Sequence, residues 1–264
     1  MTRCLLLNTD QFSVVIPTLN TRKEFLIEAL ACLQEQTLKP HEIIVVNNGR
    51  GSIDIDGIGL PIQVIDTVYK AGVAQARNFG ASVATGRFIA FLDDDDLWAK
   101  DYLEKMSLNI QENDVDCFIA RLDQLVGGHI RPYKNSHGKI TKNVILSMNP
   151  GITGSSVIVK RESFLKVGGY DPKLPPSEDK ALVLDLLISG FQVSSAPECQ
   201  AILRQHSVGE RLSDAQRMEE GISQFYRRYN KEMNVNQKIF NLLKIYRYRC
   251  ESKKSLLNFF IFLV

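Results

Sequence analysis

The sequence predicts an α/β fold, with a mainly parallel sheet covered by helices on both faces and a helical extension at the C-terminus. Apolar, β-branched runs of strand length alternate with segments whose apolar residues recur at helical spacing. Strands separated by helices need crossover connections, which make neighbouring strands parallel. The chain has 264 residues, 44% hydrophobic and 23% charged, which excludes a disordered chain and a multi-span membrane protein.

The elements follow one another along the chain in the order that such a fold requires. Strands are predicted at residues 12–16, 42–46, 62–65 and 88–92, and helices at residues 21–36 and 72–84. Pro17 should end the first strand because it has no backbone N–H. Glycines mark a less regular stretch at residues 123–150. A strand at residues 155–160, a helix at 177–189 and a helical, basic segment from residue 214 complete the prediction.

Charge and cysteine content restrict which partners and which cellular compartment are expected. The formal net charge is +2, but residues 217–264 carry 10 Lys+Arg against 4 Asp+Glu, so the tail is basic and the body mildly acidic. We expect no nucleic-acid partner. The five cysteines show no C-x-x-C spacing, and the first residues lack a signal-peptide core. A cytoplasmic protein is expected.

Four consecutive aspartates, residues 93–96, directly follow the predicted strand 88–92. In open parallel sheets, ligands bind beyond the carboxyl ends of the strands. Adjacent carboxylates repel one another unless a cation neutralises them, and Mg²⁺ or Mn²⁺ prefers carboxylate oxygen. The sequence therefore favours a metal site here. The alternative is a solvated loop that caps a following helix with negative charge.

Three other candidates are ambiguous on residue chemistry alone. Ser177 could cap a helix with Glu178 and Asp179 in its first turn, and capping is then an adequate account of all three. His206 alone is more typical of a loop than of a ligand set. Arg77, on a helix dense in small residues, is either a solvated charge or a ligand clamp.

Several chemistries are disfavoured because their motifs are missing from the sequence. There is no G-x-x-x-x-G-K-[ST] triphosphate loop, no G-x-G-x-x-G after the first strand and no G-x-S-x-G elbow. P-loop hydrolysis, hydride transfer and serine hydrolysis all become less favoured.

The order of motifs closely resembles the family 2 glycosyltransferases of the GT-A fold. The resemblance rests on residues 14–20, 42–49, 76–80, 86–96, 161–164, 167–171, 177–179 and 204–206, and extends over residues 12–210. It implies a domain at residues 1–213, with a nucleotide-sugar-binding half at 12–122 and an acceptor-side half at 123–213. Residues 214–264 would form the helical, basic and apolar extension.

The resemblance also implies roles for single residues. Asp93 and Asp95 match the D-x-D element, in which the first acid supports the nucleotide ribose and the later one binds Mn²⁺ or Mg²⁺; Asp94 or Asp96 could share these duties. Asp179 matches the general base, with Glu178 beside it. The remaining matches are nucleotide-contacting positions, Pro17, Thr18, Asn20, Asn47 and Arg77, and a residue that reaches the metal or diphosphate in some members, His206.

One departure from the family pattern concerns the nucleotide base. The family usually has Asp-Asp-Gly-Ser where residues 47–50 are Asn-Asn-Gly-Arg. In the family, the first Asp of this motif normally contacts the nucleotide base. Asn47 can still accept through its carbonyl oxygen but gains an amide donor, so nucleotide binding is expected while the choice of base is open.

The expected function is inverting transfer of a sugar from a nucleotide-diphosphate sugar to the hydroxyl of a saccharide or lipid-linked saccharide acceptor. The expected setting is synthesis of cell-surface polysaccharide or lipopolysaccharide. One alternative is a nucleotidyltransferase, although residues 17–23 lack the glycine-rich loop that holds triphosphate. The other is an inactive nucleotide-sugar-binding protein, against which both acidic motifs argue.

The C-terminal tail suggests a further partner. Residues 256–264 are apolar at eight of nine positions and follow the basic segment, so the tail could hold the protein on an anionic membrane surface at the inner face of the cytoplasmic membrane. Nine helical residues span only about 14 Å, too short to cross a bilayer. The alternative is that the tail packs on the domain or forms a homodimer contact.

Overall fold

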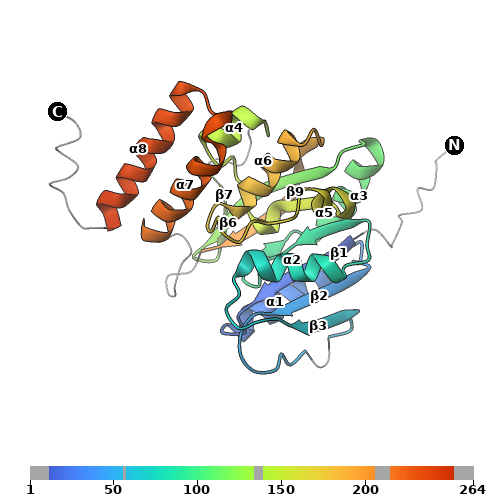
Figure 1. Ribbon diagram of the computed structural model, residues 1–264. Coiled ribbons are helices and arrows are strands. Elements are labelled where there is room, and N and C mark those ends of the chain that lie inside the picture. The colour runs from blue at the N-terminus through green and yellow to red at the C-terminus, as the bar shows by residue number, and fades with distance from the viewer. Residues whose placement is uncertain (1–11, 56–57, 134–138, 206–214, 253–264) are drawn as a thin grey trace.

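The protein is described by a computed structural model that covers residues 12–55, 58–133, 139–205 and 215–252 (Figure 1). One sheet runs through the molecule in the order β3-β2-β1-β4-β8-β6-β9-β5, and β7 pairs with β6. Its first four strands, all parallel, are β1 (Phe12–Thr18), β2 (Glu42–Asn47), β3 (Ile62–Asp66) and β4 (Phe88–Phe91).

The second half of the sheet mixes strand directions, which the sequence did not predict. β8 (Val157–Lys160) lies antiparallel between β4 and β6 (Cys117–Val126). β6 then pairs in parallel with β9 (Val193–Arg204), which also holds the short β5 (Leu97–Trp98). Strands from both predicted halves therefore form one continuous sheet.

Helices cover both faces of this sheet, as predicted. α1 (Lys23–Gln34) and α3 (Tyr102–Glu112) pack with the inward side chains of one face, including Val14 and Ile16. α2 (Val73–Val83) and α6 (Glu178–Ile188) pack on the other face, where Val15 and Val46 lie. The alternation of Val14, Val15 and Ile16 between the two faces explains why β1 is buried along its whole length.

The remaining helices all follow β6 in the chain. They are α4 (Lys142–Ser147), α5 (Arg161–Lys166), α7 (Ala215–Tyr229) and α8 (Val235–Ser252), with 3₁₀ turns at Gly154–Ser156 and Asn230–Glu232. α7 and α8 lie side by side at the end of the molecule away from β3 (Figure 1). A helical extension after residue 214 is thus confirmed for the described residues. No helix within the described segments is both long and apolar enough to span a bilayer.

Two local predictions were wrong. Pro17 lies inside β1 and pairs with Val46, because β4 pairs with β1 only as far as Val15 and the N–H that proline lacks is not needed there. The irregular stretch predicted from residue 123 begins inside β6, which continues through a Gly127-Gly128 turn into β7 (His129–Pro132). Both glycines have positive φ, 56° and 80°, as a tight hairpin requires.

Candidate active site

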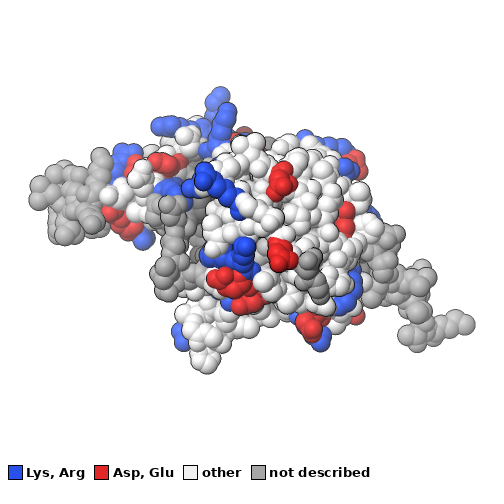
Figure 2. All heavy atoms as spheres, turned by 90° about the horizontal axis from the view of Figure 1, so that it is seen from below, with Lys and Arg blue, Asp and Glu red and all other residues white. Residues whose placement is uncertain are grey.

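A cavity of about 580 Å³ opens at the carboxyl ends of β1, β2 and β4. This is where open parallel sheets bind ligands. Its lining includes six of the predicted site residues: Pro17, Thr18, Arg77, Asp93, Asp94 and Asp95. Pro175 also lines it, and so do Arg217 and Glu220 of α7, in the C-terminal extension. Figure 2 shows acidic and basic side chains adjoining one another near the middle of one face of the molecule.

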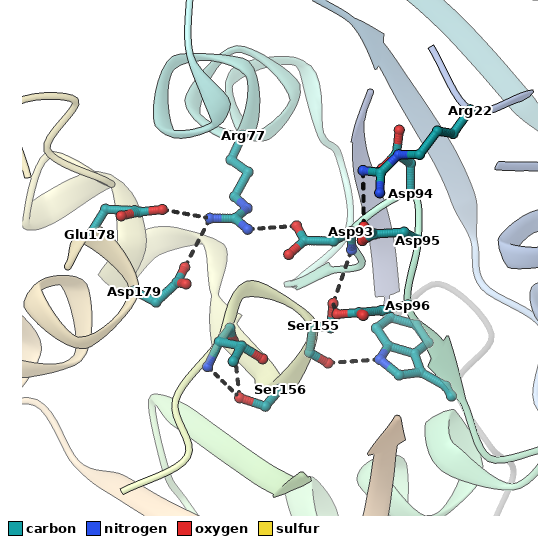
Figure 3. Close-up of polar contacts among 12 residues, drawn as sticks. Arg22, Arg77, Asp93, Asp94, Asp95, Asp96, Ser155, Ser156, Glu178 and Asp179 are labelled. Carbon is teal, nitrogen blue, oxygen red and sulfur yellow. Dashed lines mark hydrogen bonds and ion pairs between the residues drawn. The ribbon is translucent and has the colours of Figure 1, made fainter. Parts of the chain in front are cut away.

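Each of the four adjacent aspartates has its own partner, and Figure 3 shows those of Asp93 and Asp95. Asp93 lies 2.5 Å from Nη2 of Arg77, and Asp95 lies 3.0 Å from Nη2 of Arg22. Asp94 accepts a hydrogen bond from Thr18 Oγ1 at 2.5 Å. These pairings partly neutralise the cluster with protein cations and keep three of its carboxylates at the cavity.

Asp96 faces away from the cavity and is only 1% exposed. It accepts from Ser155 Oγ at 2.6 Å and from the backbone N–H of Arg204 at 3.0 Å. Asp96 therefore ties β4 to β9, and it does not line the cavity as Asp93 to Asp95 do. The alternative of a solvated loop that caps a helix was wrong, because the short strand β5 follows the aspartates.

The carboxylates of Asp94 and Asp95 offer the donors that a hard cation prefers. Burial, and to a smaller extent the charge of Asp95, raises the pKa of Asp94 to about 7 against the opposing hydrogen bond from Thr18. A bound cation would relieve this cost. Among the described residues no cluster of three or more His, Cys, Asp or Glu could hold a metal alone, so the site fits an ion that takes its other ligands from phosphate and water. His206 lies outside the described residues.

Arg77 joins the two halves of the site. Its side chain projects from α2 and is 2% exposed, with Nη2 on Asp93 and Nη1 2.9 Å from Oδ1 of Asp179 and 3.7 Å from Oε1 of Glu178. Burial disfavours its charge, but Asp179 and Asp93 outweigh this and the pKa of Arg77 is raised. Its guanidinium also lies over the ring of Tyr170, with Cζ 5.1 Å from the centroid. The interpretation as a solvated helix charge was wrong.

The acidic pair on α6 is asymmetric. The side chain of Asp179 is 19% exposed, whereas that of Glu178 is 4% exposed and its Oε2 has no hydrogen-bond partner. Burial raises the pKa of both carboxyls; Asp179 adds to the rise for Glu178, while Arg77 opposes it for both. Ser177 precedes the helix as predicted, but its side chain forms no capping hydrogen bond. Asp179 is thus the more accessible acid.

Residues 154–156 support this arrangement, and the sequence analysis missed them. The N–H of Gly154 donates to Asp179. A Cβ at Gly154 would lie 2.6 Å from Cζ and 2.9 Å from Nε of Arg77, so only glycine admits the guanidinium. Ser155 Oγ accepts from the N–H of Asp93 at 3.0 Å, which fixes the start of the aspartate run. A Gly-Ser-Ser step before an apolar strand was the available signal.

The predicted contacts of Asn20 and Asn47 are made to the protein itself. Asn47 is 4% exposed, and its amide donates to Gly51 O and to Asp66 Oδ1, both at 2.8 Å. Asn20 donates to the carbonyls of Arg50 and Ser52. Both side chains hold the 47–52 loop, and it is Asn48 that lines the cavity.

The fold and the acidic cavity at its strand ends define a protein of the GT-A class. Residues 13–168, more than half of the chain, match the family described as "Glycosyl transferase family 2", and the chain belongs to that family.

Individual proteins similar to this chain are also named as glycosyltransferases. An "Uncharacterized glycosyltransferase" of Haemophilus influenzae is 30% identical over 187 residues, 66% of this chain and 61% of the relative. The "UDP-Glc:alpha-D-GlcNAc-diphosphoundecaprenol beta-1,3-glucosyltransferase WfgD" of Escherichia coli is 28% identical over 141 residues, 50% of this chain and 55% of the relative. The matched region thus spans less than two thirds of either relative.

A solved structure supports the fold across nearly the whole chain. The mannosyltransferase PcManGT from Pyrobaculum calidifontis, in complex with GDP-Man and Mn²⁺, superposes with a TM-score of 0.65 at 19% identity, over 89% of this chain and 69% of that one. The GT-A fold class predicted from the sequence is confirmed.

Proposed function

We propose that this protein is an inverting glycosyltransferase that moves a sugar from a nucleotide-diphosphate sugar to an acceptor hydroxyl. One observation carries the proposal. Arg77 connects Asp93, at the end of β4, to Asp179, at the start of α6, across one side of the cavity (Figure 3). The carboxylates expected to hold the donor and the carboxylate expected to activate the acceptor therefore face one space.

Donor binding would use the strand-end residues. Asp93 would support the ribose, Pro17 and Thr18 would contact the nucleotide, and Asn48 and Lys70 also line the cavity. Asp94 and Asp95 would hold Mn²⁺ or Mg²⁺ on the diphosphate, where such an ion stabilises the negative charge that develops on the leaving group. A relative named for a UDP-Glc donor and a fold neighbour bound to GDP-Man leave the base open.

Acceptor activation would fall to Asp179. Its carboxylate would remove the proton of the attacking hydroxyl while the bond from the anomeric carbon to the diphosphate breaks on the opposite face, which gives inversion in one displacement. Its raised pKa improves its match to a base at neutral pH. Glu178 is too buried to reach the acceptor, so Asp179 alone would act as the base.

The acceptor is proposed to be a saccharide, free or lipid-linked, in cell-surface polysaccharide synthesis. The name of the Escherichia coli relative includes a diphosphoundecaprenol-linked sugar, and another relative is named a putative teichuronic acid biosynthesis glycosyltransferase. A chain acting on such an acceptor from the inside of the cell would work at the inner face of the cytoplasmic membrane.

A donor screen tests the proposal. Purified protein is incubated with Mn²⁺ and UDP-, GDP- or dTDP-sugars, and release of the nucleoside diphosphate is measured. Hydrolysis of one donor class, lost on Asp95→Asn, supports a transferase. Release of pyrophosphate from a sugar phosphate and a triphosphate would instead indicate the nucleotidyltransferase alternative. Donor binding without turnover for any acceptor would indicate an inactive binding protein.

A further inference from the structure

Helix α8 exposes large apolar side chains and buries polar ones, unlike an ordinary surface helix. Two of its four buried side chains are amides: Gln237 donates to Asn143 O at 3.1 Å, and Asn241 donates to Leu146 O at 2.8 Å, while Ile245 and Cys250 are the other two. Its outward face is apolar, with five large side chains that are each 42–71% exposed: Val235, Ile239, Phe240, Leu242 and Leu243. A surface helix normally buries its apolar stripe and exposes its polar one. The hydrogen bonds to α4 hold α8 in this orientation.

The outward face of α8 continues into a groove shared with α7. Ile239, Leu242, Leu243 and Tyr246 line the groove from α8, and Tyr226 and Arg227 line it from α7. Contiguous exposed apolar surface of this kind marks an interaction site in soluble domains. We refer to the five outward α8 side chains and this groove together as the α8 face.

The charge around the α8 face indicates what covers it. Residues 215–252 carry eight Lys or Arg against four Asp or Glu. Glu219 and Glu251 already pair with Arg249 and Arg247. Arg227, Lys231 and Lys238 leave the surroundings of the apolar side chains basic.

A second copy of this chain would bring the same basic surface against itself in a two-fold contact. A bilayer with anionic lipids complements both features, since acyl chains accept apolar side chains and phosphate groups attract lysine and arginine. We propose that the α8 face docks on an anionic membrane surface. The helix would lie on the membrane and not cross it.

α7 connects this surface to the candidate active site. Arg217 and Glu220 line the cavity, and Ser223, one turn further along α7, lines the groove. A membrane on the α8 face would therefore lie close to the part of the cavity that Arg217 and Glu220 line. The inference deepens the proposed function, because it brings the site to the surface where a lipid-linked acceptor is found.

The test is flotation of the full-length protein with vesicles of phosphatidylcholine and phosphatidylglycerol, against vesicles of phosphatidylcholine alone. We expect the wild type to float with the anionic vesicles only, less so at high salt. The variant Ile239→Gln/Leu242→Gln/Leu243→Gln should partition at least about tenfold more weakly. The matched control, Ile27→Gln/Ile130→Gln/Leu165→Gln, changes side chains that are 52%, 54% and 46% exposed on other elements and should float as the wild type does.

Three results would overturn the inference. The α8 variant could float as well as its control while circular dichroism shows both folded. Binding could depend only on the tail, so that Phe259→Ser/Phe260→Ser/Phe262→Ser abolishes it and the α8 variant does not. The wild type could also fail to float and instead form a dimer that the α8 variant dissociates in light scattering. Flotation needs no turnover, so these failures leave the transfer chemistry to be judged by donor hydrolysis.

Discussion

The guanidinium of Arg77 donates to Asp179 at 2.9 Å, although 102 positions separate the two residues in the sequence. The pair lies in a largely buried setting, and Arg77 contacts Asp93 as well. Removing one partner from a buried ion pair leaves an uncompensated charge, which typically costs about 3–5 kcal/mol. Substitutions at Arg77 should therefore damage folding and function together, and cleaner tests lie at its partners.

Replacing Asp179 by Asn should separate binding from chemistry. The amide keeps the shape of the side chain but cannot take the acceptor proton, so turnover should fall by several orders of magnitude while donor affinity stays near that of the wild type. Steady-state kinetics and calorimetric titration with the donor measure the two quantities. Asp185→Asn, on the same helix and bonded to Arg228 and Tyr229, is the control. Retention of more than about a tenth of turnover, about 1.4 kcal/mol, would show that Asp179 is not the base.

A single methyl group at Gly154 should disable the site. The Cβ of Gly154→Ala would meet the guanidinium of Arg77, which can move only by breaking its contacts with Asp93 and Asp179. We expect a loss of about 1–3 kcal/mol in the free energy of unfolding and at least a tenfold loss of turnover. Gly59→Ala is the control, since nothing lies within 4 Å of its added Cβ. Equal behaviour of the two variants in urea unfolding and kinetics would contradict this packing argument.

The acid limb of the pH profile should report the α6 carboxyl. Burial raises the pKa of Asp179 more than Arg77 lowers it. A base is active when deprotonated, so kcat/KM should fall as the pH falls through this raised pKa, well above the ordinary value of about 3.9 for Asp. The profile of Asp185→Asn should coincide with that of the wild type. An acid limb near pH 4 would show that no raised carboxyl controls the reaction.

Divalent metal should be required for turnover and should also stabilise the fold. Chelator should abolish activity and Mn²⁺ or Mg²⁺ restore it, and Asp95→Asn should lower metal affinity. Because an ion that binds only the folded state adds stability by mass action, saturating Mn²⁺ with a nucleoside diphosphate should raise Tm by a few degrees. Asp114→Asn, whose carboxylate is 94% exposed beside Lys160, should behave as the wild type does. Full turnover in excess chelator would refute the metal assignment.

The parallel half of the fold was predictable from the sequence because three of its four strands, β1, β2 and β4, are buried on both faces. Each of these three is a short and mostly apolar run, and each is followed by a helix or by polar strand-end residues. β9 was not predicted, because Val193–Arg204 mixes exposed and buried positions and includes Pro197. Its pairing with β6 is interrupted by a register shift between Ala120 and Arg121. The position of such a strand is set by tertiary contacts that no local pattern encodes.

The site residues were found by type and motif, but their partners were not. That Asp93, Asp94 and Asp95 line the cavity follows from their place after β4, whereas the fold alone brings Arg22 to Asp95 and Gly154 to Arg77. For Asn47 the sequence predicted a ligand contact but not the hydrogen bond by which its amide closes the 47–52 loop. Residue chemistry identifies candidate site residues, but their hydrogen bonds within the protein can be known only from the structure.

The continuous sheet restricts how relatives of this protein could exchange acceptor specificity. β8, from the half predicted to bind the acceptor, lies between β4 and β6. A recombination point near residue 122 would therefore cut through a shared hydrogen-bond ladder as well as the contacts of Arg77. A transplanted acceptor half would need a matching glycine at position 154 and a matching acid at 179 to fit the arginine of its host. Change by small substitutions in the cavity lining is the easier route, and hybrid enzymes built from this scaffold should be designed around its loops.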